Sequence, residues 1–165
     1  MAPLIVLLVV AILARLTGQA GVTPLRDWTA ATRVGLAAMF CFTAAAHFNS
    51  MRPDLVRMVP AAVPNPELMV TFTGLCEIFG GVGLLLPPTR RVAAAALIAL
   101  LLAVLPANIH AAHEGLTLGG APVTALVPRV ALQTVFILLI WWCGLRDHNS
   151  QSTRSPKGRI GAGIG

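Results

Sequence analysis

A single carboxylate, Glu77, lies in the middle of an apolar stretch, residues 67–86, that has no other charged side chain after its first residue. At the helical rise of about 1.5 Å per residue, this stretch covers about 30 Å, the thickness of the hydrocarbon core of a bilayer. An acid at that depth costs free energy unless it faces a bundle interior or is paired, so it usually marks a functional site. The sequence therefore predicts that Glu77 accepts or relays a proton.

His47 and four further polar side chains lie within or at the ends of other apolar segments. An imidazole can hydrogen-bond the carbonyl group of a ligand, so His47 joins Glu77 as a candidate catalytic residue. Amide and guanidinium groups recognise the polar or anionic parts of ligands. The candidate ligand-binding residues are Asn108, His110, Arg129 and Gln133.

The same side chains also have a structural interpretation. Glu77 could neutralise Arg129 in a buried ion pair, which would remove the need for a ligand or a proton role. Amides such as Asn108 and Gln133 commonly hold membrane helices together by hydrogen bonds. The sequence leaves both interpretations open.

His110 and His113 have the one-turn spacing of metal ligands, and His47 could complete a three-nitrogen metal site or an axial haem pair. The signal is weak, because the adjacent His113 and Glu114 are better suited to reach water at the end of a span. No cofactor-binding motif is visible in the sequence. We therefore assign no metal site, and a quinone remains the cofactor-like ligand that the polar groups would suit best.

The composition is that of a polytopic membrane protein. Hydrophobic residues make up 56% of the 165 residues and charged residues 11%, and the mean hydropathy is +0.80. This length allows four or five spans with short loops and excludes a second folded domain. The net charge of +6 comes from basic residues between apolar runs, which favours contact with the lipid bilayer over contact with nucleic acid.

Apolar runs and their proline, glycine and arginine boundaries predict an all-α fold, a polytopic transmembrane helical bundle of five spans. We expect a four-helix core in residues 30–145, preceded by an extra N-terminal span and linker in residues 1–29. Residues 54–59 fit a short helix along the membrane interface, and the polar, basic residues 146–165 predict a disordered cytoplasmic tail. The expected spans are residues 3–16, 30–48, 67–86, 92–112 and 124–145.

The first segment could also be a signal peptide, since Gly18-Gln19-Ala20 resembles a small-residue cleavage site. Its positive charges follow the apolar run instead of preceding it, so we expect a retained span. The cysteines at positions 41, 76 and 143 lie inside apolar runs without a Cys-x-x-Cys pair, and we expect all three to be buried thiols.

The distribution of basic residues predicts an outer N-terminus and a cytoplasmic C-terminus. With five spans, nine of the twelve Lys and Arg residues fall on the cytoplasmic side, and all three tryptophans lie at the inner interface. In this orientation the other candidate residues lie in the outer half of the membrane, and Glu77 lies just beneath them. The sequence therefore predicts a buried pocket that opens toward the outer face.

Several segments together resemble the DoxX family of small bacterial membrane proteins, over residues 33–142. They are Ala45-Ala46-His47-Phe48, the proline-rich loop from Met58 to Pro66, Thr73-Gly74-Leu75-Cys76-Glu77-Ile78, Thr89-Arg90-Arg91 and Pro106-Ala107-Asn108. The resemblance implies a four-helix membrane protein linked to redox complexes, because the family is named after a subunit of a thiosulfate:quinone oxidoreductase. By motif match, His47 and Glu77 would be the site residues. The additional N-terminal span departs from the family pattern.

These observations favour a multi-pass protein of the bacterial cytoplasmic (inner) membrane, a redox-associated subunit that binds a quinone or a similar small apolar molecule. Glu77 would exchange a proton, His47 would hydrogen-bond the ligand carbonyl, and Arg129 or Asn108 would polarise it. Electrons would have to come from a redox partner protein, and whether the chain is itself an enzyme stays open. The alternative is a non-enzymatic membrane binding or assembly factor whose buried polar residues are structural.

Overall fold

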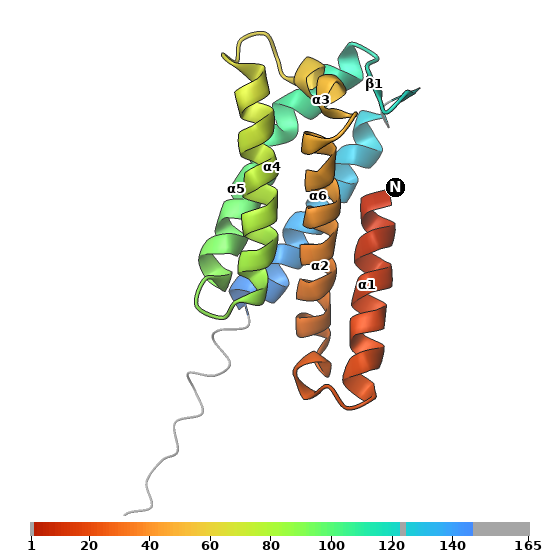
Figure 1. The fold of residues 1–165 in the computed structure, drawn as a ribbon, viewed down its shortest axis with the longest axis vertical. Coiled ribbons are helices and arrows are strands. Elements are labelled where there is room, and N and C mark those ends of the chain that lie inside the picture. The colour runs from red at the N-terminus through yellow and green to blue at the C-terminus, as the bar shows by residue number, and fades with distance from the viewer. Residues whose placement is uncertain (1, 123–124, 147–165) are drawn as a thin grey trace, which may run out of the picture.

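The chain folds as an all-α polytopic bundle, and a computed structural model describes its residues 2–122 and 125–146. Within these residues, five helices are long and apolar enough to cross a membrane. Figure 1 shows that successive long helices run in opposite directions. They are α1 (Ala2–Gln19), α2 (Trp28–Ala45), α4 (Pro66–Leu85), α5 (Arg90–His113) and α6 (Leu126–Ile140), the last continued by a π-helical turn, Trp141–Leu145.

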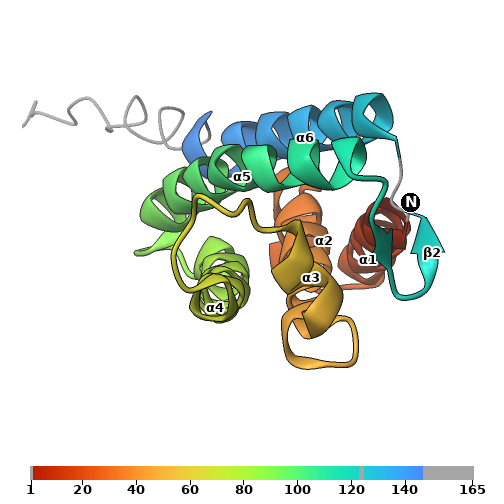
Figure 2. The same ribbon diagram turned by 90° about the horizontal axis from the view of Figure 1, so that it is seen from above.

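Each predicted span corresponds to one of these helices, with ends shifted by a few residues. Seen from above in Figure 2, α5 and α6 lie together along one side, and α1, α2 and α4 stand beside them. Consecutive long helices pack against one another, and α2 also contacts the π-helical turn. This places α2 between α1 and α4. Of the predicted tail, residues 147–165 lie outside the described residues, as does residue 124, the first of the predicted fifth span.

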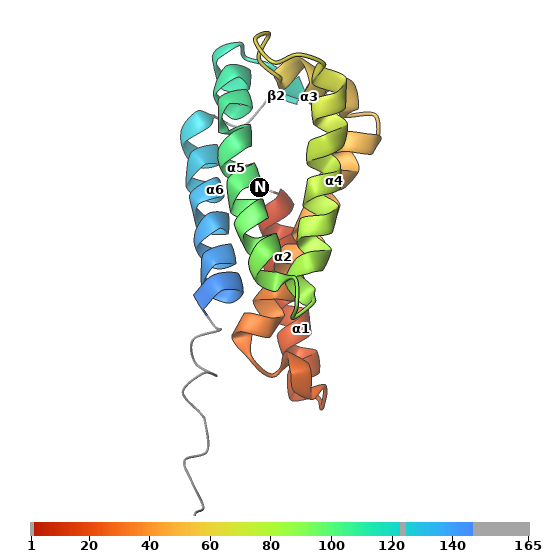
Figure 3. The same cartoon turned by 90° about the vertical axis from the view of Figure 1, so that its left-hand side faces the viewer.

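The hydrophobic core lies toward the end of the bundle where α4 turns into α5, a turn that is in the lower half of the bundle in Figure 3. Side chains from all five long helices and the π-helical turn meet there because the helices approach closely. The fully buried members include Leu36, Leu84, Leu97, Ile140 and Cys143. The candidate site residues are further toward the opposite end.

Small residues on α4 allow its close approach to both neighbours. A Cβ atom on Gly81 would lie 3.2 Å from the Ala37 carbonyl oxygen of α2. A Cβ atom on Gly80 would lie 2.5 Å from Leu97 of α5. The remaining face of α4, which includes Leu75 and Val82, is exposed, as is typical of lipid-facing positions.

The prediction of three buried thiols is wrong for Cys41. Cys143 is buried and Cys76 is partly buried, but Cys41 is exposed on the outside of the bundle. Its neighbour Phe42 is also exposed, whereas Phe40 and Ala44 are buried. The inward face of α2 follows the helical repeat of 3.6 residues, and position 41 falls on the opposite face.

A compact cap covers the end of the bundle away from the core, where α2 ends and α4 begins. It consists of the 3-10 turn Ala46–Phe48, helix α3 (Arg52–Met58) and a hairpin of β1 (Thr117–Leu118) and β2 (Ala121–Pro122). Helix α3 confirms the predicted short helix, and it starts earlier because Pro53 suits a first helical turn. The hairpin lies between α5 and α6 in the chain. Positive φ angles at Gly119 and Gly120 permit its tight connection.

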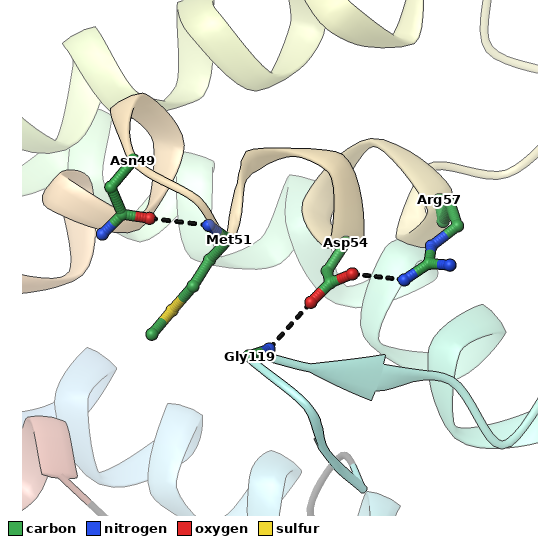
Figure 4. A network of polar contacts seen from close by, with 5 residues as sticks. All are labelled: Asn49, Met51, Asp54, Arg57 and Gly119. Carbon is green, nitrogen blue, oxygen red and sulfur yellow. Dashed lines mark hydrogen bonds and ion pairs between the residues drawn. The ribbon is translucent and has the colours of Figure 1, made fainter.

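Polar contacts hold α3 to the hairpin (Figure 4). The backbone N–H of Gly119 donates to Asp54 Oδ2 at 2.8 Å, and the other carboxylate oxygen of Asp54 pairs with Arg57. The backbone N–H of Met51 donates to Asn49 Oδ1 at 2.8 Å, which fixes the turn that leads into α3. The cap is therefore tied together across 65 residues of sequence.

Arg52 joins the cap to the start of α4. Its guanidinium donates to the His47 carbonyl oxygen at 3.0 Å, to the Glu67 carbonyl oxygen at 3.0 Å and to Thr71 Oγ1 at 2.9 Å. Arginine can make this contact because its planar group carries five donors in fixed directions. Arg52 thus fixes the backbone at His47 relative to α4.

We expect Arg52→Gln to lower the free energy of unfolding by about 2 kcal/mol, since hydrogen bonds from a charged group to three acceptors are lost. Denaturant unfolding of the purified protein in detergent measures this change. Arg57→Gln is the matched control: its side chain is exposed and pairs within the same helix, so its loss should cost less than about 0.5 kcal/mol. Equal effects of the two substitutions would contradict the role of Arg52.

Candidate functional site

The candidate site is built on the antiparallel contact between α2 and α4. Gly81 of α4 packs on Phe40 of α2, and one turn earlier along α4 Glu77 meets Thr43. One further turn along, Gly74 contacts His47, since a Cβ atom there would lie 2.7 Å from His47 Cβ. Residues on one face of each helix recur every three or four positions. The sequence thereby brings Thr43, His47, Gly74 and Glu77 into what we call the Glu77 cluster.

Glu77 is held by a single side-chain contact. Thr43 Oγ1 donates to Glu77 Oε2 at 2.8 Å, and both residues are partly buried. Among the described residues, Glu77 forms no ion pair with Arg129 or with any other cation. The structural interpretation that Glu77 neutralises Arg129 is therefore not realised here. Thr43 anchors one carboxyl oxygen, and no other side chain of the described residues bonds to the group.

His47 lies in the 3-10 turn at the end of α2, one helical turn beyond Thr43. Its Nδ1 atom is 3.4 Å from the Thr43 carbonyl oxygen, which is a weak contact. Its ring packs against Gly74 of α4 and against the neighbouring Phe48, whose ring centroid is 6.5 Å away. The imidazole and the carboxyl group of Glu77 are consequently on the same α2–α4 contact, one α4 turn apart.

Asn108 and Gln133 form a second polar cluster, between α5 and α6. Asn108 Nδ2 donates to Gln133 Oε1 at 3.3 Å, and Gln133 Nε2 donates to the Leu101 carbonyl oxygen. Leu101 lies next to Leu102, whose carbonyl loses its helical donor because Pro106 has no N–H. Gln133 is buried and its amide bonds are directed to protein atoms. This arrangement matches the structural interpretation of the two amides.

The predicted site residues thus fall into two clusters. No hydrogen bond or ion pair between described residues connects the Glu77 cluster to Asn108 and Gln133. The single pocket shared by all candidates stays a prediction, and the contacts that carry chemistry around Glu77 come from α2 and α4.

We expect Gln133→Leu to lower the free energy of unfolding by about 1 kcal/mol, because interhelical hydrogen bonds in membranes are worth about 0.6 kcal/mol on average and at most about 1.7. A double-mutant cycle with Asn108→Leu in detergent measures the coupling between the two amides. A coupling of zero would show that the 3.3 Å contact contributes nothing to the bundle.

Arg129 and His110 lie near the cap end of α6 and α5. Arg129 is in the first turn of α6, and its Nη1 atom is buried without a hydrogen-bond partner among the described residues. His110 is in the last turn of α5 and is partly buried. Its ring makes no hydrogen bond with a described residue. Arg129 and His110 stay candidate ligand-binding residues because of the chemistry of their side chains, and no contact among the described residues adds to that prediction.

A metal site from His47, His110 and His113 is not assembled. Within the described ranges, no group of three or more His, Cys, Asp or Glu side chains is placed to hold an ion. His113 is exposed at the end of α5, as expected of a residue that reaches water.

Sequence reasoning missed Thr43, the one side chain in the described part of the chain that bonds to the carboxyl group of Glu77. A signal was present, since Thr43 precedes His47 by four residues and therefore lies on the same face of α2. A lone threonine in an apolar span usually bonds back to its own helix, and Thr43 Oγ1 is indeed 3.1 Å from the Phe40 carbonyl oxygen. Only the packing of α4 on α2 shows its second partner.

Comparison with known proteins gives one family. The profile of a family described as Domain of unknown function (DUF8561) matches residues 36–144, about two thirds of the chain. The matched range begins within α2 and ends in the π-helical turn, so it contains every candidate site residue and leaves out α1. No curated protein and no solved structure matches the chain.

Proposed function

This chain belongs to the family described as Domain of unknown function (DUF8561), and we propose that it is a membrane-embedded binding subunit of a redox system. Its ligand is a quinone or a similar small apolar molecule, and its location is the bacterial cytoplasmic membrane. The resemblance to the DoxX family supports this proposal as a prediction from sequence motifs. The five apolar helices support the membrane location in general.

One observation carries the proposal. Glu77 lies twelve residues into a 20-residue apolar helix, and its carboxyl group has a threonine hydroxyl as its side-chain partner instead of a cation. Acids within spans are costly and are generally retained for proton transfer or ligand recognition. A carboxyl group without a cation can exchange a proton with a bound molecule.

The chemistry of a quinone suits this cluster. When a quinone is reduced, its carbonyl oxygens must receive protons in a place that holds little water. Glu77 supplies a proton-exchanging oxygen, and His47 supplies a ring nitrogen that can hydrogen-bond a carbonyl. The apolar faces of α2 and α4 would accommodate the ring and tail of the ligand. Electrons would come from a partner protein.

Photolabelling with a photoreactive short-chain benzoquinone tests this proposal on the protein in lipid nanodiscs. We expect labelled peptides from α2 and α4, competition by the unlabelled quinone, and at least about tenfold weaker labelling of Glu77→Gln, since a hydrogen bond to a charged group is worth about 1.5–3 kcal/mol.

Glu67→Gln is the matched control for this experiment. Glu67 lies on the same helix, but its side chain is exposed at the start of α4, so labelling should not change. Labelling of Glu77→Gln at the wild-type level, or labelling that excess quinone does not compete, would overturn the proposal.

A second candidate function is a non-enzymatic binding or assembly factor. The observation that favours it is that polar contacts join helices in both clusters, through Thr43 and Glu77 and through Asn108 and Gln133. Under this alternative, Glu77 is needed for stability and not for a ligand. The two functions therefore differ in the effect of removing the carboxyl group.

A further inference from the structure

The hydroxyl group of Thr43 has more acceptors within reach than it has protons. Its Oγ1 atom is 2.8 Å from Glu77 Oε2, 3.1 Å from the Phe40 carbonyl oxygen and 3.2 Å from the Met39 carbonyl oxygen. A threonine hydroxyl donates one hydrogen bond and accepts up to two. It can therefore point its proton either at the carboxyl group or at its own helix.

The direction of this proton follows from the state of Glu77. A carboxylate only accepts hydrogen bonds, so ionised Glu77 requires Thr43 to be the donor. A protonated carboxyl group has an O–H of its own and can donate from Oε2 to Thr43 Oγ1. The hydroxyl of Thr43 is then free to donate to the Phe40 or Met39 carbonyl oxygen of α2.

We propose that Thr43 is a positioning residue that reverses its hydrogen bond with Glu77 when Glu77 gains or loses a proton. The contact between α2 and α4 persists in both states, because only the donor changes. The exchanged proton moves between Glu77 and water or a bound ligand. Thr43 keeps one proton throughout, so the number of protons balances in both arrangements.

This inference rests on the proposed function in one respect: it assumes that Glu77 changes its protonation state in use. It adds the mechanism by which the bundle tolerates that change. Without Thr43, a carboxyl group between two packed helices would lose its only side-chain partner among the described residues in one or both states. Because the hydrogen bond reverses, the carboxyl group keeps a partner in both states and the free-energy cost of an unpaired buried group is avoided.

The surroundings of Glu77 contain few other ionisable groups that could substitute for Thr43. On the α2 side the titratable neighbour is His47, one turn along the helix contact. Residues 92–109 of α5, which packs on the other side of α4, include no Asp, Glu, Lys, Arg or His. From α3, Arg52 approaches α4 at Thr71, where its guanidinium is engaged by protein oxygens. On α4 itself the neighbour is Cys76.

Infrared difference spectroscopy tests the inference without any ligand. Spectra of the full-length protein at acidic and neutral pH are subtracted, and the carbonyl band of protonated Glu77 is identified as the band that Glu77→Gln removes. We expect Thr43→Val to shift this band to higher wavenumber, since a carboxylic acid that donates no hydrogen bond has a stiffer C=O bond. Thr43→Ser, which keeps the hydroxyl, should restore the wild-type position.

Thr134→Val is the matched control, because among the residues that the structure describes the Thr134 hydroxyl bonds only back to its own helix, at 2.9 Å from the Val130 carbonyl oxygen. It should leave the band unchanged. If Thr43→Val does not fold, Thr43→Ala serves in its place. An unshifted band in the valine or alanine variant, a serine variant that does not restore the band, or no Glu77 band at any pH would overturn the inference.

The outcome is separable from that of the proposed function. A shifted band in a protein that the quinone does not label would leave the hydrogen-bond reversal standing and remove the quinone proposal. If labelling depends on Glu77 but the infrared band is the same with and without the Thr43 hydroxyl, the quinone proposal stands and the hydrogen-bond reversal is removed.

Discussion

Replacing Glu77 with leucine is expected to abolish quinone labelling while leaving the free energy of unfolding unchanged or higher. The loss of labelling follows because leucine offers no oxygen to the ligand head. The unchanged stability follows because Thr43 can donate to the Phe40 carbonyl oxygen, 3.1 Å away, so no buried hydroxyl is left unpaired. Replacing a buried ionisable group with an apolar side chain of similar size is often neutral or stabilising.

Two measurements on Glu77→Leu check this expectation: photolabelling in nanodiscs and denaturant unfolding in detergent. Gln133→Leu is the comparison variant. The Gln133 amide has a structural role through its bonds to Asn108 and the Leu101 carbonyl oxygen, so this substitution should lower the free energy of unfolding. A loss of about 2 kcal/mol or more in Glu77→Leu would instead support the assembly-factor alternative, in which the carboxyl group holds α2 and α4 together.

Gly74→Val is expected to have the second large effect, on stability and labelling together. A Cβ atom at position 74 would lie 2.7 Å from His47 Cβ and 2.9 Å from His47 Cγ. The position of His47 Cβ is fixed by its backbone, which Arg52 holds, so the helices must separate. Overpacking of this kind costs about 1–3 kcal/mol. The separation should also draw Thr43 away from Glu77.

The neighbouring substitution Leu75→Val provides the control, because Leu75 is exposed on the outer surface of the bundle. It should change neither the unfolding midpoint in detergent nor the labelling. Unfolding of Gly74→Val at the wild-type midpoint would contradict the close approach of α4 to His47 at the end of α2.

Much of the fold follows from the sequence because a membrane span must be a long, apolar helix. This requirement identified all five spans. The glycines on either side of Glu77 contact different elements: Gly81 packs against α2, and Gly74 packs against the 3-10 turn that follows α2. The orientation of the chain across the membrane stays a prediction from the positions of its basic residues.

The partition of the site into two clusters could not be predicted in the same way. Depth along each span is readable from the sequence, and it placed Glu77 and the amides at similar levels. Which helices are neighbours is not readable, so the pairing of Asn108 with Gln133 and of Thr43 with Glu77 emerged only from the fold. The exposure of Cys41 was missed for a related reason, since hydropathy does not distinguish lipid from protein as an apolar surrounding.

The central claim is that Glu77 is an exchangeable carboxyl group in the α2–α4 contact and that a quinone occupies its surroundings. Reaction with dicyclohexylcarbodiimide, an apolar reagent that modifies protonated carboxyl groups, tests it most directly when mass spectrometry follows the α4 peptide. The account predicts modification at Glu77 that a saturating short-chain quinone slows. Modification at the same rate with and without the quinone would contradict it.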